Sequence, residues 1–62
     1  MKVIKVDEVR LDMKIWVDGY GALTVSGISR TTKGRFFVLN TLEAGPFVYH
    51  YNETVRIIEK EA

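Results

Sequence analysis

The sequence predicts an all-β fold, a small barrel made of short strands. Five short segments rich in β-branched and aromatic residues follow one another from Lys14 to Ile58, and Gly, Asp, Asn and Pro occupy the gaps between them. Short strands at regular spacing, separated by turn signals, are typical of a small barrel or sandwich. No gap is long enough for a helix of several turns. The five segments are residues 14–17, 22–25, 35–39, 47–51 and 55–58.

Length and composition agree with one small globular domain that spans residues 1–62. The chain is 47% hydrophobic and 27% charged, which is ordinary globular usage and argues against disorder. A domain of this length buries only about 60% of the surface that its unfolded chain exposes, so we expect modest stability. The net charge is only +1, whereas domains built around nucleic-acid binding are often more basic.

The first elements are a short strand, a second strand and a tight turn. Residues 2–6 alternate only partly between apolar and polar side chains, which indicates a short strand. In the next strand Ile15 and Val17 are expected to point inward, because successive side chains point to opposite faces. Trp16 then points outward or caps the end of the barrel. The Asp-Gly-Tyr-Gly segment at 18–21 predicts the turn, since glycine adopts positive φ with little strain.

The following strand contains a predicted bulge. Leu23 and Val25 share a face, but the spacing from Val25 to Ile28 is odd. An odd spacing reverses the face unless one extra residue is absorbed. Glycine is common at bulges, so we expect a bulge or a sharp bend near Ser26 and Gly27, of the kind by which small barrels turn corners.

The segment 35–39 is the most hydrophobic strand and has two candidate core faces. Phe36 and Val38 share one face, and Phe37 and Leu39 share the other. Phe36 is expected in the core. If Phe37 and Leu39 are exposed, they form an apolar patch, and such patches mark interfaces. A homodimer formed through this strand or through the C-terminal tail is therefore one expectation.

The last two strands are joined by a short connection. The loop 42–46 ends in Gly-Pro, which sets the entry into the strand 47–51. The three aromatic side chains of that strand share one face, and Phe47 with one or two tyrosines is expected to fill the core. Residues 52–54 suit one 3₁₀ turn, and the strand 55–58 then closes the barrel.

Most of the chain follows one recognisable order of elements: strand, long turn, strand, basic loop, strand, short turn, strand, 3₁₀ turn and last strand. The matching residues are Ile15-Trp16-Val17, Gly19 and Gly21, Thr24 to Ile28, and Val55-Arg56-Ile57-Ile58. In these residues the chain resembles the SH3-like barrel, and most of all the prokaryotic KOW and Tudor-like barrels. The resemblance implies a five-stranded barrel with a 3₁₀ turn before its last strand. A single barrel this short also resembles many small proteins encoded by phages or mobile elements.

The basic connection between the second and third of these strands predicts a contact with nucleic acid. The resemblance implies RNA, DNA, peptide or methyl-lysine binding, so function has to be argued from the site itself. Basic side chains contact phosphates, hydroxyl groups donate to them, and aromatic faces stack on bases. The alternative is a solvated hairpin connection that is kept polar to protect the sheet. The predicted nucleic-acid site consists of Arg30, Thr31, Thr32, Lys33 and Arg35, with Trp16, Tyr20 and Tyr49 nearby.

The second hypothesis is a protein-interaction module. Aromatic-lined grooves bind extended or proline-rich segments, and Tyr and Trp are enriched at interface hot spots. A phage-encoded modulator of a host protein would fit this hypothesis. In so small a barrel, however, most aromatic side chains are also needed to fill the core. The predicted protein-binding residues are Trp16, Tyr20, Tyr49 and Tyr51.

Catalysis, metals, cofactors and membranes are not expected. His50 is the only histidine, and a lone histidine with scattered carboxylates is neither a catalytic set nor a metal cluster. The chain has no cysteine, so it needs no oxidising compartment. No apolar run approaches the roughly 18 residues that span a membrane, and the first residues do not form a signal peptide. We therefore expect a cytoplasmic, non-catalytic module.

Overall fold

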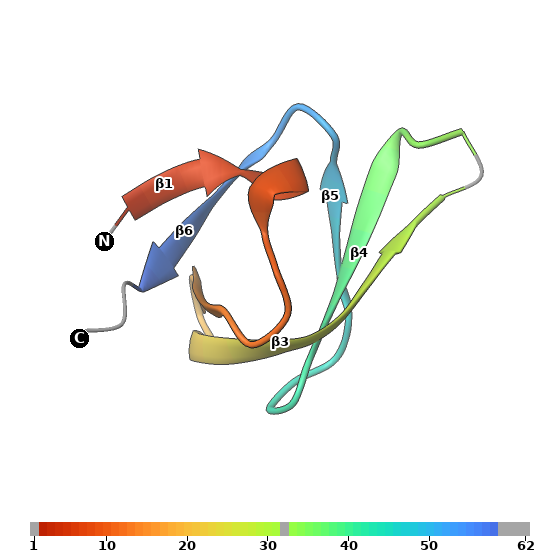
Figure 1. Cartoon of the computed structure of the whole chain (residues 1–62). Helices are drawn as coiled ribbons and strands as arrows, with labels where there is room; N and C mark the ends of the chain where they lie inside the picture. Colours follow the sequence, from red (N-terminus) through yellow and green to blue (C-terminus); the bar gives the residue numbers. More distant parts are fainter. Residues whose placement is uncertain (1, 32, 59–62) are drawn as a thin grey trace.

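The structure is a computed structural model that describes residues 2–31 and 33–58, and in this part of the chain it is all-β apart from one turn of 3₁₀ helix. Six strands form one antiparallel sheet in the order β1-β6-β2-β3-β4-β5 (Figure 1). The strands are β1 (Lys2–Lys5), β2 (Lys14–Val17), β3 (Gly21–Arg30), β4 (Phe36–Thr41), β5 (Phe47–His50) and β6 (Thr54–Ile58), and the 3₁₀ helix is η1 (Val6–Glu8).

The all-β prediction is confirmed, but the closed five-stranded barrel is wrong. The N-terminal segment is a full sixth strand, because β1 pairs along its length with β6, from Lys2 opposite Ile57 to Lys5 opposite Thr54. The last strand is therefore an interior strand that pairs with both β1 and β2. Within the described residues β1 and β5 are not paired with each other, so the sheet is open between them.

The 3₁₀ turn also lies elsewhere than expected. It follows β1 as η1, where the backbone N–H of Val9 donates to the carbonyl oxygen of Val6 at 3.2 Å. The connection before the last strand is instead a tight turn. The backbone N–H of Glu53 donates to the carbonyl oxygen of His50 at 2.8 Å, and the Glu53 carboxylate accepts the His50 N–H at 2.8 Å. This side-chain contact stabilises a turn in place of a helix.

The predicted bulge in β3 is confirmed, and it explains how this one long strand pairs with both β2 and β4. The first part of β3 pairs with β2 as far as Thr24, and the second part pairs with β4. The register shifts between Val25 and Gly27, so Ser26 is the extra residue. A Cβ atom on Gly27 would lie 3.3 Å from the side-chain nitrogen of Asn40, so the absence of a side chain there allows the close approach of β4.

The core lies on the inner face of the bent sheet. Ile15 is fully buried and Trp16 is turned outward, as predicted. The buried pair in β4 is Phe37 and Leu39, whereas Phe36 is 40% exposed, so the expectation that Phe36 fills the core is wrong. The eight buried hydrophobic residues among those described are Val6, Val9, Ile15, Leu23, Val25, Phe37, Leu39 and Val55.

The register of β4 against β5 explains which face is buried. Phe37 lies opposite Tyr49 and Leu39 lies opposite Phe47, so both aromatic residues of β5 turn toward the core. Phe47 is half-buried and packs against the core, as expected. The Phe37–Leu39 patch on which a homodimer was predicted is therefore buried. The C-terminal tail, the other predicted dimer contact, lies outside the described residues beyond position 58.

The β4–β5 loop is held by two polar side chains. The Thr41 hydroxyl donates to the carbonyl oxygen of Ala44 at 3.0 Å and accepts the Ala44 N–H at 3.1 Å. The Glu43 carboxylate accepts both the backbone N–H of Thr24 at 2.7 Å and its hydroxyl at 2.9 Å. Thr24 is the last residue of β3 that pairs with β2, so Glu43 joins the loop to the point where β3 changes partner.

Candidate nucleic-acid interface

The β3–β4 hairpin extends beyond the rest of the sheet, and its loop has a defined shape (Figure 1). The backbone N–H of Thr31 donates to the carbonyl oxygen of Phe36 at 3.0 Å, and the Thr31 hydroxyl accepts the Phe36 N–H at 3.2 Å. The N–H of Gly34 donates to the Thr31 carbonyl at 2.8 Å. Gly34 has φ of +66°, a conformation that favours glycine. Thr31 thus has a structural role in the loop, and Thr32 lies outside the described residues.

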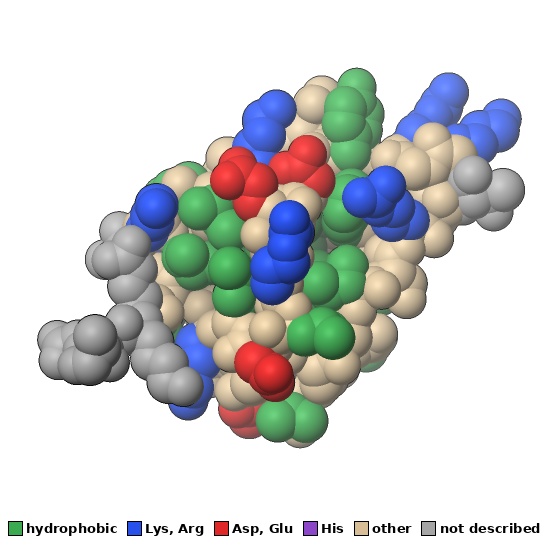
Figure 2. Space-filling model, viewed as in Figure 1, with side chains coloured by type: hydrophobic (Ala, Val, Ile, Leu, Met, Phe, Trp, Pro, Cys, Tyr) green, Lys and Arg blue, Asp and Glu red, His purple; other side chains and the backbone are tan. Residues whose placement is uncertain are grey.

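The hairpin is positively charged without compensation. It carries Arg30, Lys33 and Arg35, while positions 19–42 contain no Asp or Glu, so this segment has a net charge of +3. All three cations are exposed. Figure 2 shows Lys and Arg side chains gathered at the hairpin end, while the acidic side chains visible in this view lie over the body of the molecule. We call Arg30, Lys33 and Arg35 the basic tip.

Arg30 differs from the other two cations because it also covers the core. Its Cζ atom lies 5.0 Å from the centroid of the Phe37 ring, which is within cation–π range. Arg30 and Phe37 are opposite each other in the β3–β4 register, so they share the inner face. Lys33 and Arg35 have no such contact with a ring among the described residues. They are therefore the members of the tip that are free to bind a ligand without loss of core packing.

The four aromatic residues of the predicted protein site do not form one surface. Trp16 and Tyr49 line the same cleft. Tyr20 packs edge-on against Phe47, with ring centroids 5.1 Å apart. Tyr51 lies elsewhere, against His50, with ring centroids 4.6 Å apart. The predicted groove is therefore divided into a cleft, a turn contact and a separate aromatic cluster.

The cleft has a volume of about 440 Å³ and is lined by residues of β1, β2, β5 and β6 and the turn after β2. The Trp16 indole N–H donates to Asp18 at 3.2 Å, and the Arg56 guanidinium lies 3.7 Å from the same carboxylate oxygen. Trp16 is 36% exposed. Burial raises the pKa of the Tyr49 phenol, and the charge of Glu53 raises it further, so this phenol stays neutral at physiological pH.

Tyr51 is placed beside the basic tip, a relation that the sequence analysis missed. Its backbone N–H donates to the carbonyl oxygen of Arg35 at 2.9 Å. The Phe36 ring stands edge-on to the His50 imidazole, with centroids 5.4 Å apart. Only the pairing of β4 with β5 reveals that these aromatic residues lie together. Phe36 and His50 are far apart in the sequence but directly opposite each other in the strand register.

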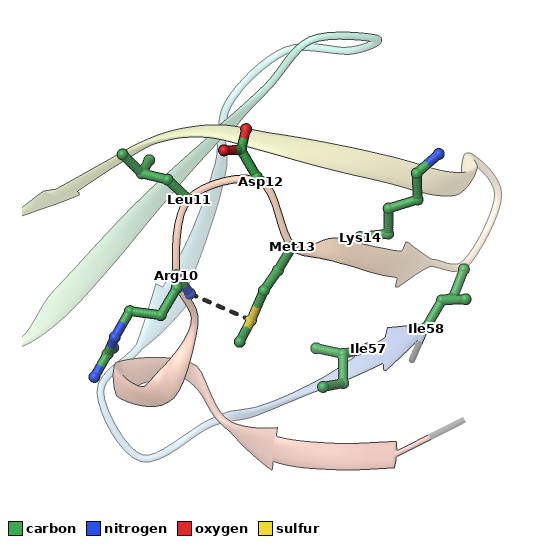
Figure 3. Close-up of a pocket in the computed structure, with 7 residues that line it drawn as sticks. All are labelled: Arg10, Leu11, Asp12, Met13, Lys14, Ile57 and Ile58. Carbon is green, nitrogen blue, oxygen red and sulfur yellow. Dashed lines mark hydrogen bonds between the residues drawn. The ribbon is translucent and has the colours of Figure 1, made fainter. Parts of the chain in front are cut away.

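A second cavity, larger than the Trp16–Tyr49 cleft, lies at another part of the molecule. It has a volume of about 770 Å³ and is lined by the segment from Arg10 to Lys14 and by Ile57 and Ile58. Figure 3 shows the Met13 and Ile57 side chains directed into the space between this segment and β6, whereas Leu11 and Asp12 point away. The Met13 sulfur accepts the backbone N–H of Arg10 at 3.3 Å. The lining is mostly apolar, with Arg10, Asp12 and Lys14 as its charged residues.

His50 is occupied by contacts within the protein. Its Nδ1 atom accepts the backbone N–H of Asn52 at 3.3 Å, and its ring lies against those of Phe36 and Tyr51. Among residues 2–31 and 33–58, no three His, Cys, Asp or Glu side chains are grouped to hold a metal ion. The same residues include no helix with the length and apolar character needed to cross a bilayer.

Comparisons with known proteins assign neither a family nor a function to this chain. The chain matches no protein-family model, and neither the curated proteins nor the solved structures contain a significant match to it. The resemblance to SH3-like, KOW and Tudor-like barrels therefore stays a prediction, and function has to be argued from the sites described above.

Proposed function

We propose that this protein is a non-catalytic binding module that contacts nucleic acid through the basic tip of the β3–β4 hairpin. The observation that carries the proposal is the charge of the hairpin, which is +3 with no acidic residue between positions 19 and 42. Phosphate neutralisation by Lys and Arg supplies most of the sequence-independent affinity for nucleic acids. A projecting and uncompensated cluster can approach a phosphate backbone without repulsion from the acidic residues of the body.

The test is a titration of fluorescein-labelled duplex and single-stranded oligonucleotides, followed by anisotropy at about 20 mM and about 200 mM salt. Binding through phosphates should weaken steeply as salt rises. The double variant Lys33→Ala/Arg35→Ala should bind duplex more weakly, and the slope of log affinity against log salt should fall by about two, one for each phosphate contact.

The matched control is Lys5→Ala/Lys14→Ala, which removes the same charge from exposed positions on β1 and β2. It should retain most of the affinity and most of the slope. Arg30 is left unchanged in both variants, because its removal would also expose Phe37. Equal losses in the two double variants would show that net charge, and not the hairpin, determines binding.

A protein partner held in the Trp16–Tyr49 cleft is the second candidate. It is favoured by the 36% exposure of Trp16 and by the opposed charges of Asp18 and Arg56 at the cleft. Aromatic anchors flanked by charge are typical of peptide recognition. Absence of nucleic-acid binding at low salt would favour this candidate, and its partner should then be lost on Trp16→Ala and retained by the Lys33→Ala/Arg35→Ala variant.

A further inference from the structure

Beside the basic tip lies a cluster of three rings, Phe36, His50 and Tyr51, which we call the aromatic ledge. Phe36 is 40% exposed and Tyr51 is 47% exposed. The three rings form a row in space. Phe36 stands edge-on to His50, and His50 is tilted by 35° against Tyr51. None of the three belongs to the buried core, so their burial is not what the fold depends on.

The ledge is held rigidly against the tip. Phe36 exchanges two hydrogen bonds with Thr31 across the hairpin loop, and the Tyr51 N–H donates to the carbonyl oxygen of Arg35. Figure 1 shows the β5–β6 connection and the β3–β4 hairpin at the same end of β4 and β5, in the upper part of the view. The backbones of Phe36 and Tyr51 are thus joined to the loop that carries Lys33 and Arg35. Rings that are already held in place lose little conformational entropy when a ligand binds.

We infer that the aromatic ledge stacks on unpaired bases, so that the protein binds single-stranded nucleic acid in preference to duplex. This inference rests on the proposed function, since the basic tip supplies the phosphate contacts. Stacking on aromatic side chains needs a free base face, which a duplex offers only at its ends, and it tolerates every base. DNA and RNA share this chemistry, and the choice between them is left to the probes.

One acidic side chain borders the ledge. Glu53 lies in the β5–β6 turn, and its carboxylate accepts the His50 N–H. This hydrogen bond holds the Glu53 carboxylate at the His50 backbone, within the β5–β6 turn. The cations near the ledge therefore belong to the β3–β4 hairpin, and the nearby carboxylate belongs to the β5–β6 turn. A strand that lays its phosphates along the hairpin and its bases on the rings places its charges beside the cations and not in the turn that holds this carboxylate.

The experiment titrates fluorescein-labelled oligothymidylate and oligouridylate of about 12 nucleotides, and a mixed-sequence duplex of the same length, into the full chain at low salt. Wild type should bind the single strands more tightly than the duplex. Tyr51→Ala should weaken single-strand binding roughly 5- to 150-fold, the range that corresponds to loss of one stacked base, and should leave duplex binding unchanged. A difference between the two single strands would identify DNA or RNA as the preferred form.

Two controls separate stacking from general loss of surface. Tyr51→Phe keeps the ring and should retain single-strand affinity. Val48→Ala removes apolar surface from β5 on the same face as Phe36, since Val48 is 61% exposed and lies opposite Val38, and it should also bind as wild type. The folded state of each variant is checked by its thermal unfolding curve, and Phe36→Ala is the second ledge variant if Tyr51→Ala is destabilised.

The outcomes distinguish this inference from the function on which it rests. Equal affinity for single strand and duplex, unchanged by Tyr51→Ala but reduced by Lys33→Ala/Arg35→Ala, would overturn the stacking inference and support the proposed function. No binding to any probe at low salt would overturn both. A selective loss of single-strand binding in Tyr51→Ala, with Tyr51→Phe and Val48→Ala intact, supports both.

Discussion

At the scale of single residues, a few polar side chains join segments that the sheet alone would leave loosely connected. Glu43 is the clearest case, since both of its carboxylate oxygens accept hydrogen bonds from Thr24 across the β4–β5 loop. Thr41 closes the same loop through Ala44. These contacts satisfy the backbone N–H of Thr24, where the pairing of β3 with β2 ends, and that of Ala44 in the β4–β5 loop.

The Glu43 contact makes part of the stability depend on pH. The hydrogen bond from the Thr24 N–H is the main reason why the pKa of Glu43 lies below its ordinary value of 4.5. A carboxyl group with a depressed pKa stabilises the folded state above its unfolded pKa, and this contribution is lost as the pH falls through the folded pKa. We expect wild type to melt at a higher temperature than Glu43→Gln near pH 7, with the difference shrinking below about pH 4.5.

The measurement is a series of thermal unfolding curves for both proteins from neutral to acidic pH. Because Glu43 is fully exposed, the effect should be small and should decrease with added salt. A constant difference between the two proteins at every pH would mean that the hydrogen bonds to Thr24 do not depend on the charge of Glu43.

At the scale of elements, the bulge in β3 determines which side chains reach the core. Val25 pairs with Thr41 and Gly27 pairs with Asn40, so Ser26 is absorbed without a partner. Because of this extra residue, Val25 and Ile28 both contact the same core. A slip of one residue would reverse the faces of the second half of the strand.

Deletion of Ser26 should therefore be far more damaging than its substitution. The deletion should turn Ile28 outward, or break the β3–β4 pairing, at a cost of about 2 kcal/mol or more, the contribution of one buried aliphatic side chain. Ser26→Ala, at an exposed position, should change the free energy of unfolding by less than about 0.5 kcal/mol. Urea unfolding compares the two, and similar midpoints would show that the bulge is dispensable.

The bulge was predictable because the odd spacing from Val25 to Ile28 and the presence of Gly27 are local signals. Strand register is not local, and the main errors follow from it. The sequence allows either face of 36–39 to be buried, and only the partners Tyr49 and Phe47 in β5 select Phe37 and Leu39. The same register brings Tyr51 to Arg35, which is why the aromatic ledge was missed while the charged residues of the tip were found.

At the scale of the whole molecule, a chain of 62 residues has a small core and an open sheet. The pairing of β1 with β6 turns the expected closing strand into an interior one. Alternation in residues 2–6 is too weak to predict that pairing, so the sequence indicated a barrel where the structure has two free edges. Stability then depends heavily on eight buried side chains.

Two leucines test this dependence with identical chemistry, Leu39 within β4 and Leu42 just after it. Leu39 is fully buried, and Leu42 is 72% exposed. Leu39→Ala should cost about 2–5 kcal/mol, a large part of the roughly 3–9 kcal/mol expected for a domain of this length. Leu42→Ala should change the unfolding free energy by less than about 0.5 kcal/mol. The check is urea unfolding of both variants, and equal midpoints would contradict the assigned core.

The placement of β1 and β6 has a consequence for how the hairpin can be used. Lys2 and Ile57 are paired, so the start of β1 and the end of β6 lie side by side, across the molecule from the β3–β4 hairpin (Figure 1). A tether attached at either of these points leaves the hairpin unobstructed. Two copies joined in tandem through them would present two hairpins to one long strand, and the second contact would form at the raised effective concentration set by the linker.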